Sequence, residues 1–386
     1  MSKVLQSPET SLNSSASSIP QQRKYPFWLM PLLLIVYFGI ATLLFFYWVN
    51  PSLTGENDKH ITADSPRYIY FGESLRSGEI DPYVASALYS FPNTNWGPTL
   101  LAYLAPDTYG MMLINLGIFS LSLWFFSRAV HINPALFLLL LVLNPTTTIS
   151  LLAVNKELLD LLSLSLFLYY LRHHNRLLLL LALTISLVSR FETCATILIF
   201  LFFRSRWNLW RGRRLRSLFA YCILLDLGMA FLLSLPSQAS RLTEAGDAAG
   251  EAVASSGLLL MLNNLEIHFL FVVALVPKLL DNLFAEVFNV SHWFAFSMDD
   301  PANTFILFGN NLANLVIVVY LAIRRKLSIR SSIIYYATLI AITMSVSVVI
   351  QPRYFYGVYA LLCLEGARRI QHTPSEQPGR IVNAVA

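Results

Sequence analysis

The chain has 386 residues, of which 56% are hydrophobic and only 13% are charged. Soluble globular domains carry roughly 25% charged residues, so this composition excludes a soluble protein and predicts an all-α polytopic membrane protein. The formal net charge is +5. Because the basic residues lie in short segments between apolar runs, as in the cytosolic loops of membrane proteins, we expect no nucleic-acid partner.

The N-terminal residues 1–25 are polar and rich in serine. They predict a disordered cytosolic tail rather than a signal peptide, because the apolar run behind them is too long and no small-residue cleavage site follows it. Residues 26–370 are expected to form a single transmembrane helical domain, and residues 371–386 a second cytosolic tail. The three cysteines lie in apolar runs and indicate neither a disulfide framework nor a metal motif.

Basic segments orient the predicted helices. Residues 204–216 carry six arginines and no acid, and residues 324–330 carry four basic residues and no acid. The basic residues near positions 23, 172–176 and 368 match them. The positive-inside rule places all of these segments, and both termini, in the cytosol. The protein is predicted to lie in a cell (inner) membrane and to cross it many times.

The first predicted span is about Phe27–Val49. Residues 50–109 follow as a long extracytoplasmic loop with seven acids and three basic residues. Span two, near Gly110–Val130, returns to the cytosol. Residues 135–154 lead out again and are interrupted at Asn144-Pro145, and the next apolar run returns to the basic residues 172–176.

The segment Leu177–Phe203 is flanked by basic residues at both ends and contains the charged sequence SRFE. A single crossing would place one basic end outside and would leave two charges near the middle of the bilayer. Two short helices that meet at Arg190 keep both basic ends in the cytosol. The sequence therefore predicts an outward-facing corner at Arg190 and Glu192.

The remaining spans are expected at Leu218–Leu235, Thr304–Ile323, Ile333–Ile350 and Tyr354–Ala367. Residues 257–300 are expected to cross an even number of times and to be interrupted by NNLEIH and PKLLDN. The total is about 10–12 helices, some too short to cross ~30 Å of hydrocarbon. Short helices that meet at polar corners predict a cavity open to the extracytoplasmic side.

Four polar clusters fall on that side of the predicted topology. They contain Asp64, the run Asn155, Lys156 and Glu157, the pair Arg190 and Glu192, and Arg353. Cations suit a phosphate group, and a carboxylate suits a general base. Structural roles are the alternatives. Asp64 would cap a helix, Lys156 would pair with Glu157 at the interface, Arg190 would pair with Glu192, and Arg353 would begin a helix.

The first outer loop reads DSPRYIYFGESLRSGEIDPY and continues to FPNTNWGPTLLAYL. This pattern resembles the first loop of the GT-C superfamily of membrane glycosyltransferases. The stretches NPTTTISLLAVNKELL and QPRYFYGVYALL resemble segments of such transferases and of bacterial polysaccharide polymerases. The resemblance implies a GT-C-like fold, a polyprenyl-phosphate-linked sugar donor, an outer-face site and Asp64 as the general base.

The resemblance also departs from the family pattern. A serine follows Asp64 where many members have a second acid, so no cofactor is predicted and a divalent metal has no support. In the expected mechanism, Lys156, Arg190 and Arg353 neutralise the departing lipid phosphate. Glu192 holds Arg190 or contacts a sugar hydroxyl, and Tyr68 stacks on a sugar ring. Asn155 and Glu157 complete the predicted substrate-binding set, and a glycan or lipid is the expected acceptor.

Two alternative functions fit the same residues. One is an O-antigen or exopolysaccharide polymerase that uses repeat units linked to a lipid pyrophosphate. The long first loop favours the transferase over this reading. The other is a lipid or solute transporter, because broken helices and charges at depth are transporter features. Transporters commonly contain two related halves, and no internal repeat is evident in this chain.

Overall fold

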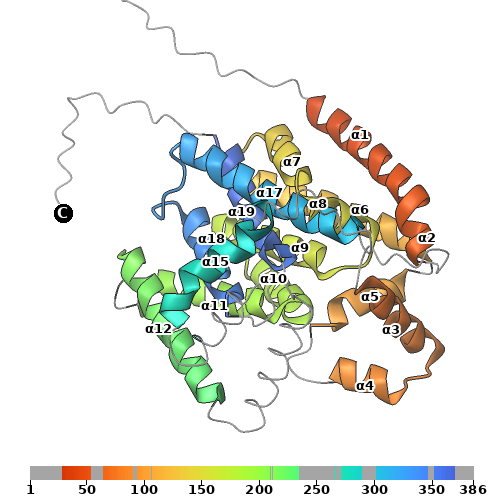
Figure 1. The fold of residues 1–386 in the computed structure, drawn as a ribbon, viewed down its shortest axis with the longest axis horizontal. Coiled ribbons are helices and arrows are strands. Elements are labelled where there is room, and N and C mark those ends of the chain that lie inside the picture. Colours follow the sequence, from red (N-terminus) through yellow and green to blue (C-terminus); the bar gives the residue numbers. More distant parts are fainter. Residues whose placement is uncertain are drawn as a thin grey trace, which may run out of the picture.

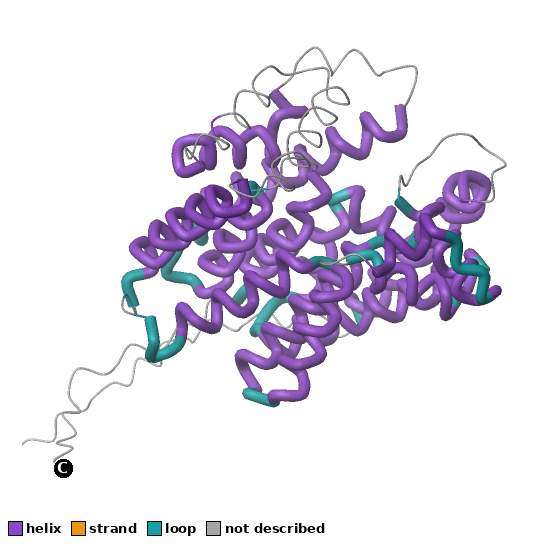
Figure 2. The backbone as a smooth tube through the Cα atoms, turned by 90° about the horizontal axis from the view of Figure 1, so that it is seen from below, coloured by secondary structure: helices purple, strands orange, loops and turns teal. Residues whose placement is uncertain are grey.

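The computed structural model describes residues 28–53, 64–89, 94–105, 107–208, 210, 212–233, 265, 271–288, 301–346 and 352–369. Within these ranges every named element is helical, and an isolated bridge between Ile132 and Arg368 is the nearest approach to a strand. Figures 1 and 2 show these helices packed together as a bundle. The predicted all-α architecture is confirmed for this part of the chain. The two predicted cytosolic tails lie outside the described residues.

Three helical segments are long and apolar enough to cross a membrane among the described residues. The first is Leu29–Val49, where α1 (Leu29–Leu44) continues into a short π-helical stretch, η1 (Phe45–Val49). The second is α6 (Thr108–Ala129), and the third is the Ile306–Ile323 part of α17 (Pro301–Ile323). Large apolar side chains such as Ile35 and Leu113 are more than half exposed, as expected of lipid-facing positions.

A broken helix lies next to the first span. Helix α7 (Pro134–Val142) and helix α8 (Pro145–Leu152) are bent by 87° at the predicted interruption. Pro145 starts α8, and the side chain of Asn144 accepts a hydrogen bond from the backbone N–H of Thr146. Proline at the first helical position after an Asn cap starts a new helix, so the break is local in origin.

The segment that contains SRFE is two helices, as predicted. Helix α10 (Arg176–Ser189) ends and helix α11 (Phe191–Arg204) begins at Arg190, whose backbone is extended at φ −155° and ψ 92°. Helix α9 (Lys156–His173) packs along both α10 and α6 and is buried over most of its length. The corner at Arg190 therefore lies beside the first turn of α9.

The segment predicted as a long extracytoplasmic loop, residues 50–109, is largely helical where the structure describes it. It contains α2 (Asn50–Leu53), α3 (Ser65–Ser77), α4 (Pro82–Tyr89) and α5 (Trp96–Leu104), and Figure 1 shows α3, α4 and α5 grouped beside the end of α2. These helices have a small core of their own, which includes Tyr68, Phe71 and Leu88. Arg76 donates hydrogen bonds to three backbone carbonyls at the end of α5.

Helix α3 touches α5 at Gly72, and a Cβ there would lie 2.8 Å from backbone and side-chain atoms of Ala102. We expect Gly72→Ala to push α3 away from α5 and to cost about 1–3 kcal/mol of stability. The melting temperature of the detergent-purified protein measures this loss. Gly117→Ala in α6 is the control, because no atom lies within 4 Å of its added Cβ. Equal effects of the two substitutions would contradict the close contact.

The C-terminal part contains α12 (Arg214–Leu233), α15 (Phe271–Phe288), α17, α18 (Ser332–Met344), the 3₁₀ turn η2 (Pro352–Phe355) and α19 (Tyr356–Ala367). Every residue of α19 is buried, so this predicted span is a central helix of the bundle. The expected span Ile333–Ile350 is helical only as far as Met344 within the described residues. Residues 237–256 lie outside them, as does NNLEIH apart from Leu265.

One expected interruption is wrong. The segment PKLLDN lies inside α15, which runs through Pro277. Lys278 is fully buried, Asn282 is 2% exposed, and the Asn282 side-chain amide donates to the Lys278 carbonyl at 2.8 Å. Helices α12 and α17 pack against α15. Packing against these helices offsets the backbone hydrogen bond that proline removes, so the helix continues through Pro277.

Candidate functional site

Asp64 and Arg353 form an ion pair between residues that are 289 positions apart in the sequence. The Arg353 Nη2 lies 2.6 Å from the Asp64 Oδ2, and the two side chains are 23% and 34% exposed. Asp64 occupies the N-cap position of α3, but its side chain makes no capping hydrogen bond. Its carboxylate contacts Arg353 instead of the helix start, so the pair joins α3 to η2.

The start of α3 is also tied to the start of α9. The Ser65 hydroxyl donates to the carbonyl of Val154 at 2.6 Å. Two residues later, the Lys156 ammonium donates to the Thr94 hydroxyl at 2.8 Å and lies 5.8 Å from the centre of the Tyr68 ring. Lys156 therefore joins the same junction as Asp64. Its contacts are a hydroxyl and an aromatic ring rather than the neighbouring Glu157 that one structural alternative proposed.

Arg190 reaches this junction from the corner between α10 and α11. Its Nη2 lies 3.1 Å from the Glu157 Oε1, and its Nη1 donates to the Tyr354 carbonyl at 3.2 Å. Arg190 and Glu157 are 5% and 2% exposed. Their pair is thus a buried one, in contrast to the partly exposed pair of Asp64 and Arg353.

The expectation that Glu192 pairs with Arg190 is wrong. Glu192 is exposed in the first turn of α11, whereas Arg190 has an extended backbone that precedes this helix. The Arg190 side chain therefore turns back to α9, where Glu157 meets it. A contact of Glu192 with a sugar hydroxyl stays a prediction.

Several buried polar atoms around Arg190 have no hydrogen-bond partner in the described structure. They are the Arg190 Nε, the Glu157 Oε2, the Asp160 Oδ1 and the Thr193 Oγ1. Buried polar groups are usually paired, so the guanidinium and these carboxylates have unused bonding capacity. Asp160 is not among the site residues that the sequence predicted. The spacing from Glu157 could have indicated its place, because residues three apart in the apolar run ELLDLL share one face of a helix.

Asn155 is the N-cap residue of α9 and is 7% exposed, without a side-chain capping bond. Tyr68 is 3% exposed and faces the same junction through its contact with Lys156. Desolvation by burial, followed by the charge of Asp64, raises the pKa of the Tyr68 hydroxyl, so the phenol stays neutral. Gln351, which precedes η2, lies outside the described residues.

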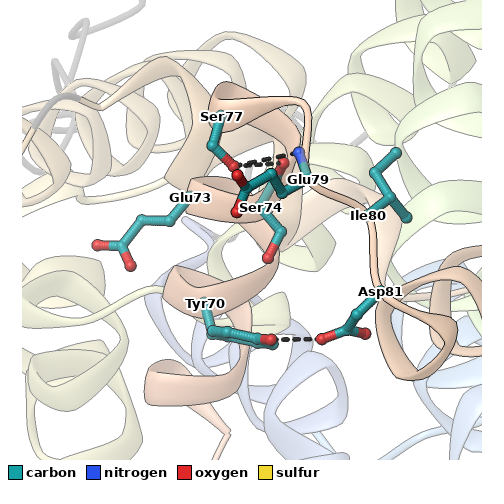
Figure 3. A pocket seen from close by; sticks show the side chains of 7 residues that line it. All are labelled: Tyr70, Glu73, Ser74, Ser77, Glu79, Ile80 and Asp81. Carbon is teal, nitrogen blue, oxygen red and sulfur yellow. Dashed lines mark hydrogen bonds between the residues drawn. The ribbon is translucent and has the colours of Figure 1, made fainter.

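A separate pocket of about 560 Å³ lies between α3 and the start of α4. Figure 3 shows the Tyr70 hydroxyl pointing to the Asp81 carboxylate, with Glu73, Ser74, Ser77, Glu79 and Ile80 as the other lining residues. The Tyr70 hydroxyl donates to Asp81 and thereby lowers the pKa of that carboxyl. None of the predicted site residues lines this pocket, and its carboxylates would repel a phosphate.

The predicted residues Asp64, Tyr68, Asn155, Lys156, Glu157, Arg190 and Arg353 thus lie at one junction of α3, α9, η2 and the α10–α11 corner. The cations Lys156 and Arg353 retain exposed surface there, whereas Arg190 is buried. Comparisons of the chain with models of known protein families, with curated proteins and with solved structures find no match.

Proposed function

We propose that the protein is an integral membrane glycosyltransferase. It transfers a sugar from a polyprenyl-phosphate-linked donor to an acceptor hydroxyl on the extracytoplasmic face of the membrane. The observation that carries this proposal is the meeting of one partly exposed carboxylate, Asp64, with two partly exposed cations, Arg353 and Lys156. Distant segments of the chain bring these groups to the same place, next to apolar helices.

The charges match the reaction. The acceptor oxygen attacks the anomeric carbon, and the bond from that carbon to the phosphate oxygen breaks. The bonding electrons leave with the phosphate, so negative charge grows on it, and the acceptor proton passes to Asp64. Arg353 offers a planar fork of donors to the phosphate and Lys156 offers a compact point charge. Cations placed where charge develops stabilise the transition state.

The surroundings suit a lipid-linked donor. Leu187 and Phe191, which flank the Arg190 corner on either side, are 42% and 38% exposed although both are apolar. The isoprenoid tail of the donor is proposed to lie against such surfaces within the bilayer, with its phosphate at the cation cluster. A soluble nucleotide-sugar donor would gain nothing from this apolar setting.

The proposal is tested by comparing lipid-linked and surface glycans from cells with and without the protein. We expect mass spectrometry to show the loss of a single sugar when the protein is absent, and its return with the wild-type chain. Loss of long chains with intact single units would instead indicate a polymerase. Unchanged glycans in both samples would contradict a role in glycan synthesis.

A further inference from the structure

The buried residue Arg190 and the partly exposed residue Arg353 both contact Tyr354. The guanidinium carbon of Arg190 lies 5.3 Å from the centre of the Tyr354 ring, and that of Arg353 lies 5.7 Å from the same centre. Arg190 also donates to the Tyr354 backbone carbonyl at 3.2 Å. Both distances to the ring are within the range of cation–π attraction.

The Arg190 side chain is also held by Glu157. Its ion pair with Glu157 joins the α10–α11 corner to the first turn of α9, and both partners are nearly fully buried. Asp160, one turn further along α9 than Glu157, is also nearly fully buried, at 2% exposure. Gly357 in the first turn of α19 lies so close to Asp160 that a Cβ would be 3.0 Å from the carboxylate. Arg190 is therefore a fixed cation rather than a mobile one.

The contacts form a continuous path across the site, from Glu157 through Arg190 and Tyr354 to Arg353 and then Asp64. Tyr354 is the residue that follows Arg353 in the short turn η2. Fixing its carbonyl and ring fixes the backbone from which Arg353 extends. A four-residue turn has few hydrogen bonds of its own, so such outside contacts decide its conformation.

We propose that Arg190 is a positioning residue that acts on the lipid phosphate through Tyr354 and Arg353, without touching the phosphate. This inference rests on the proposed function, because it assumes that Arg353 binds the phosphate of the donor. The sequence predicted that Arg190 neutralises the phosphate directly. In this inference, Arg190 instead holds Arg353 in place, and Arg353 binds the phosphate.

The test is a set of double-mutant cycles on ligand affinity. Farnesyl phosphate is the probe, with farnesol and inorganic phosphate as comparisons that separate the tail from the anion. Binding is measured by tryptophan fluorescence on the full chain in lipid nanodiscs, after each variant is shown to elute as a single folded species. The substitutions are Tyr354→Leu, which removes the ring but leaves the Arg190–Glu157 pair, together with Arg353→Gln and Lys156→Gln.

We expect Tyr354→Leu to weaken the affinity for farnesyl phosphate about three- to tenfold, which is the range of a cation–π contact. Adding Tyr354→Leu to Arg353→Gln should have no further effect, because Tyr354 acts on the phosphate only through Arg353. Adding it to Lys156→Gln should multiply the two losses, because Lys156 has no contact with Tyr354 in the described structure. Tyr354→Phe keeps the aromatic ring and should bind farnesyl phosphate with wild-type affinity.

The same cycle with Arg190→Gln gives the direct test. Non-additivity with Arg353→Gln supports a positioning role. If the losses from Arg190→Gln and Arg353→Gln multiply, Arg190 contacts the phosphate itself and the inference is overturned while the proposed function stands. If the wild-type protein binds farnesyl phosphate no better than farnesol, the proposed function fails and the inference fails with it.

Discussion

Replacing Asp64 by asparagine is expected to abolish sugar transfer and, in the same protein, to strengthen the binding of an isoprenyl phosphate. The Asp64 Oδ2 lies 2.6 Å from the Arg353 Nη2. The proposed mechanism needs Arg353 on the phosphate and the Asp64 carboxylate on the acceptor hydroxyl. The phosphate therefore competes with Asp64 for Arg353, and removal of the carboxylate charge removes the competitor.

The two effects differ in size. Loss of a general base costs about 10²- to 10⁴-fold in rate. The pair is partly exposed, and such pairs contribute up to about 1 kcal/mol, so the gain in affinity should be about fivefold or less. Transfer is measured with the glycan assay described above, and affinity with farnesyl phosphate in nanodiscs. The Asp64→Asn variant is expressed in cells for the glycan assay and is purified into nanodiscs for the affinity measurement.

Asp81→Asn is the matched control. Asp81 lies in the same segment, residues 50–109, but it accepts a hydrogen bond from Tyr70 and lines the separate pocket. Neither transfer nor phosphate affinity should change in this variant. Full activity of Asp64→Asn would remove Asp64 from the role of base. Weaker binding of farnesyl phosphate by Asp64→Asn would contradict competition for Arg353.

Replacing Glu157 by alanine is expected to destabilise the protein strongly. Arg190 would keep its charge at 5% exposure but would lose its ion-pair partner. Removal of one member of a buried pair costs about 3–5 kcal/mol, because an uncompensated charge remains. We expect a large fall in melting temperature and in the amount of folded protein recovered from membranes, as measured by fluorescence-detected gel filtration.

A double variant separates charge from packing. Glu157→Leu together with Arg190→Leu removes both charges, and it should recover much of the stability lost in Glu157→Ala. It should not recover phosphate affinity, because Tyr354 would have lost its anchor. Glu192→Ala is the control, since Glu192 is the neighbouring but exposed acid. If Glu192→Ala proves as damaging as Glu157→Ala, the observed pairing of Arg190 is wrong.

Local sequence features predicted the helix breaks. Asn144 caps a helix that Pro145 begins, and these residue types act in this way in most surroundings. The break at Arg190 followed from basic residues at both ends of one apolar run. The first break is indicated by neighbouring residues, and the second by the positive-inside rule, which places basic residues in the cytosol. Such signals do not require knowledge of which helices become neighbours.

Among the helices of residues 50–109, the sequence predicts only the start of α3 at Asp64, because these helices depend on contacts between distant residues. The segment of α3 has several polar residues, and its partner α5 is about thirty positions away in the sequence. Their contact depends on Gly72 meeting Ala102. Likewise, Pro277 and Lys278 suggested an interruption because each is unfavourable in an isolated apolar helix. Contacts with neighbouring helices outweigh that local preference in α15.

By itself, the sequence determined the helical class, three of the apolar spans and the set of charged residues that local rules could not explain as solvated surface. Burying a charge or an unpaired backbone group is costly wherever it occurs. Helical spans and unusual charged residues can therefore be recognised before their neighbours in the fold are known. Only the tertiary structure decided which charge meets which. Glu157 rather than Glu192 pairs with Arg190, and Arg353 pairs with Asp64, because ion pairs act over a few ångströms and depend on how helices are placed against one another.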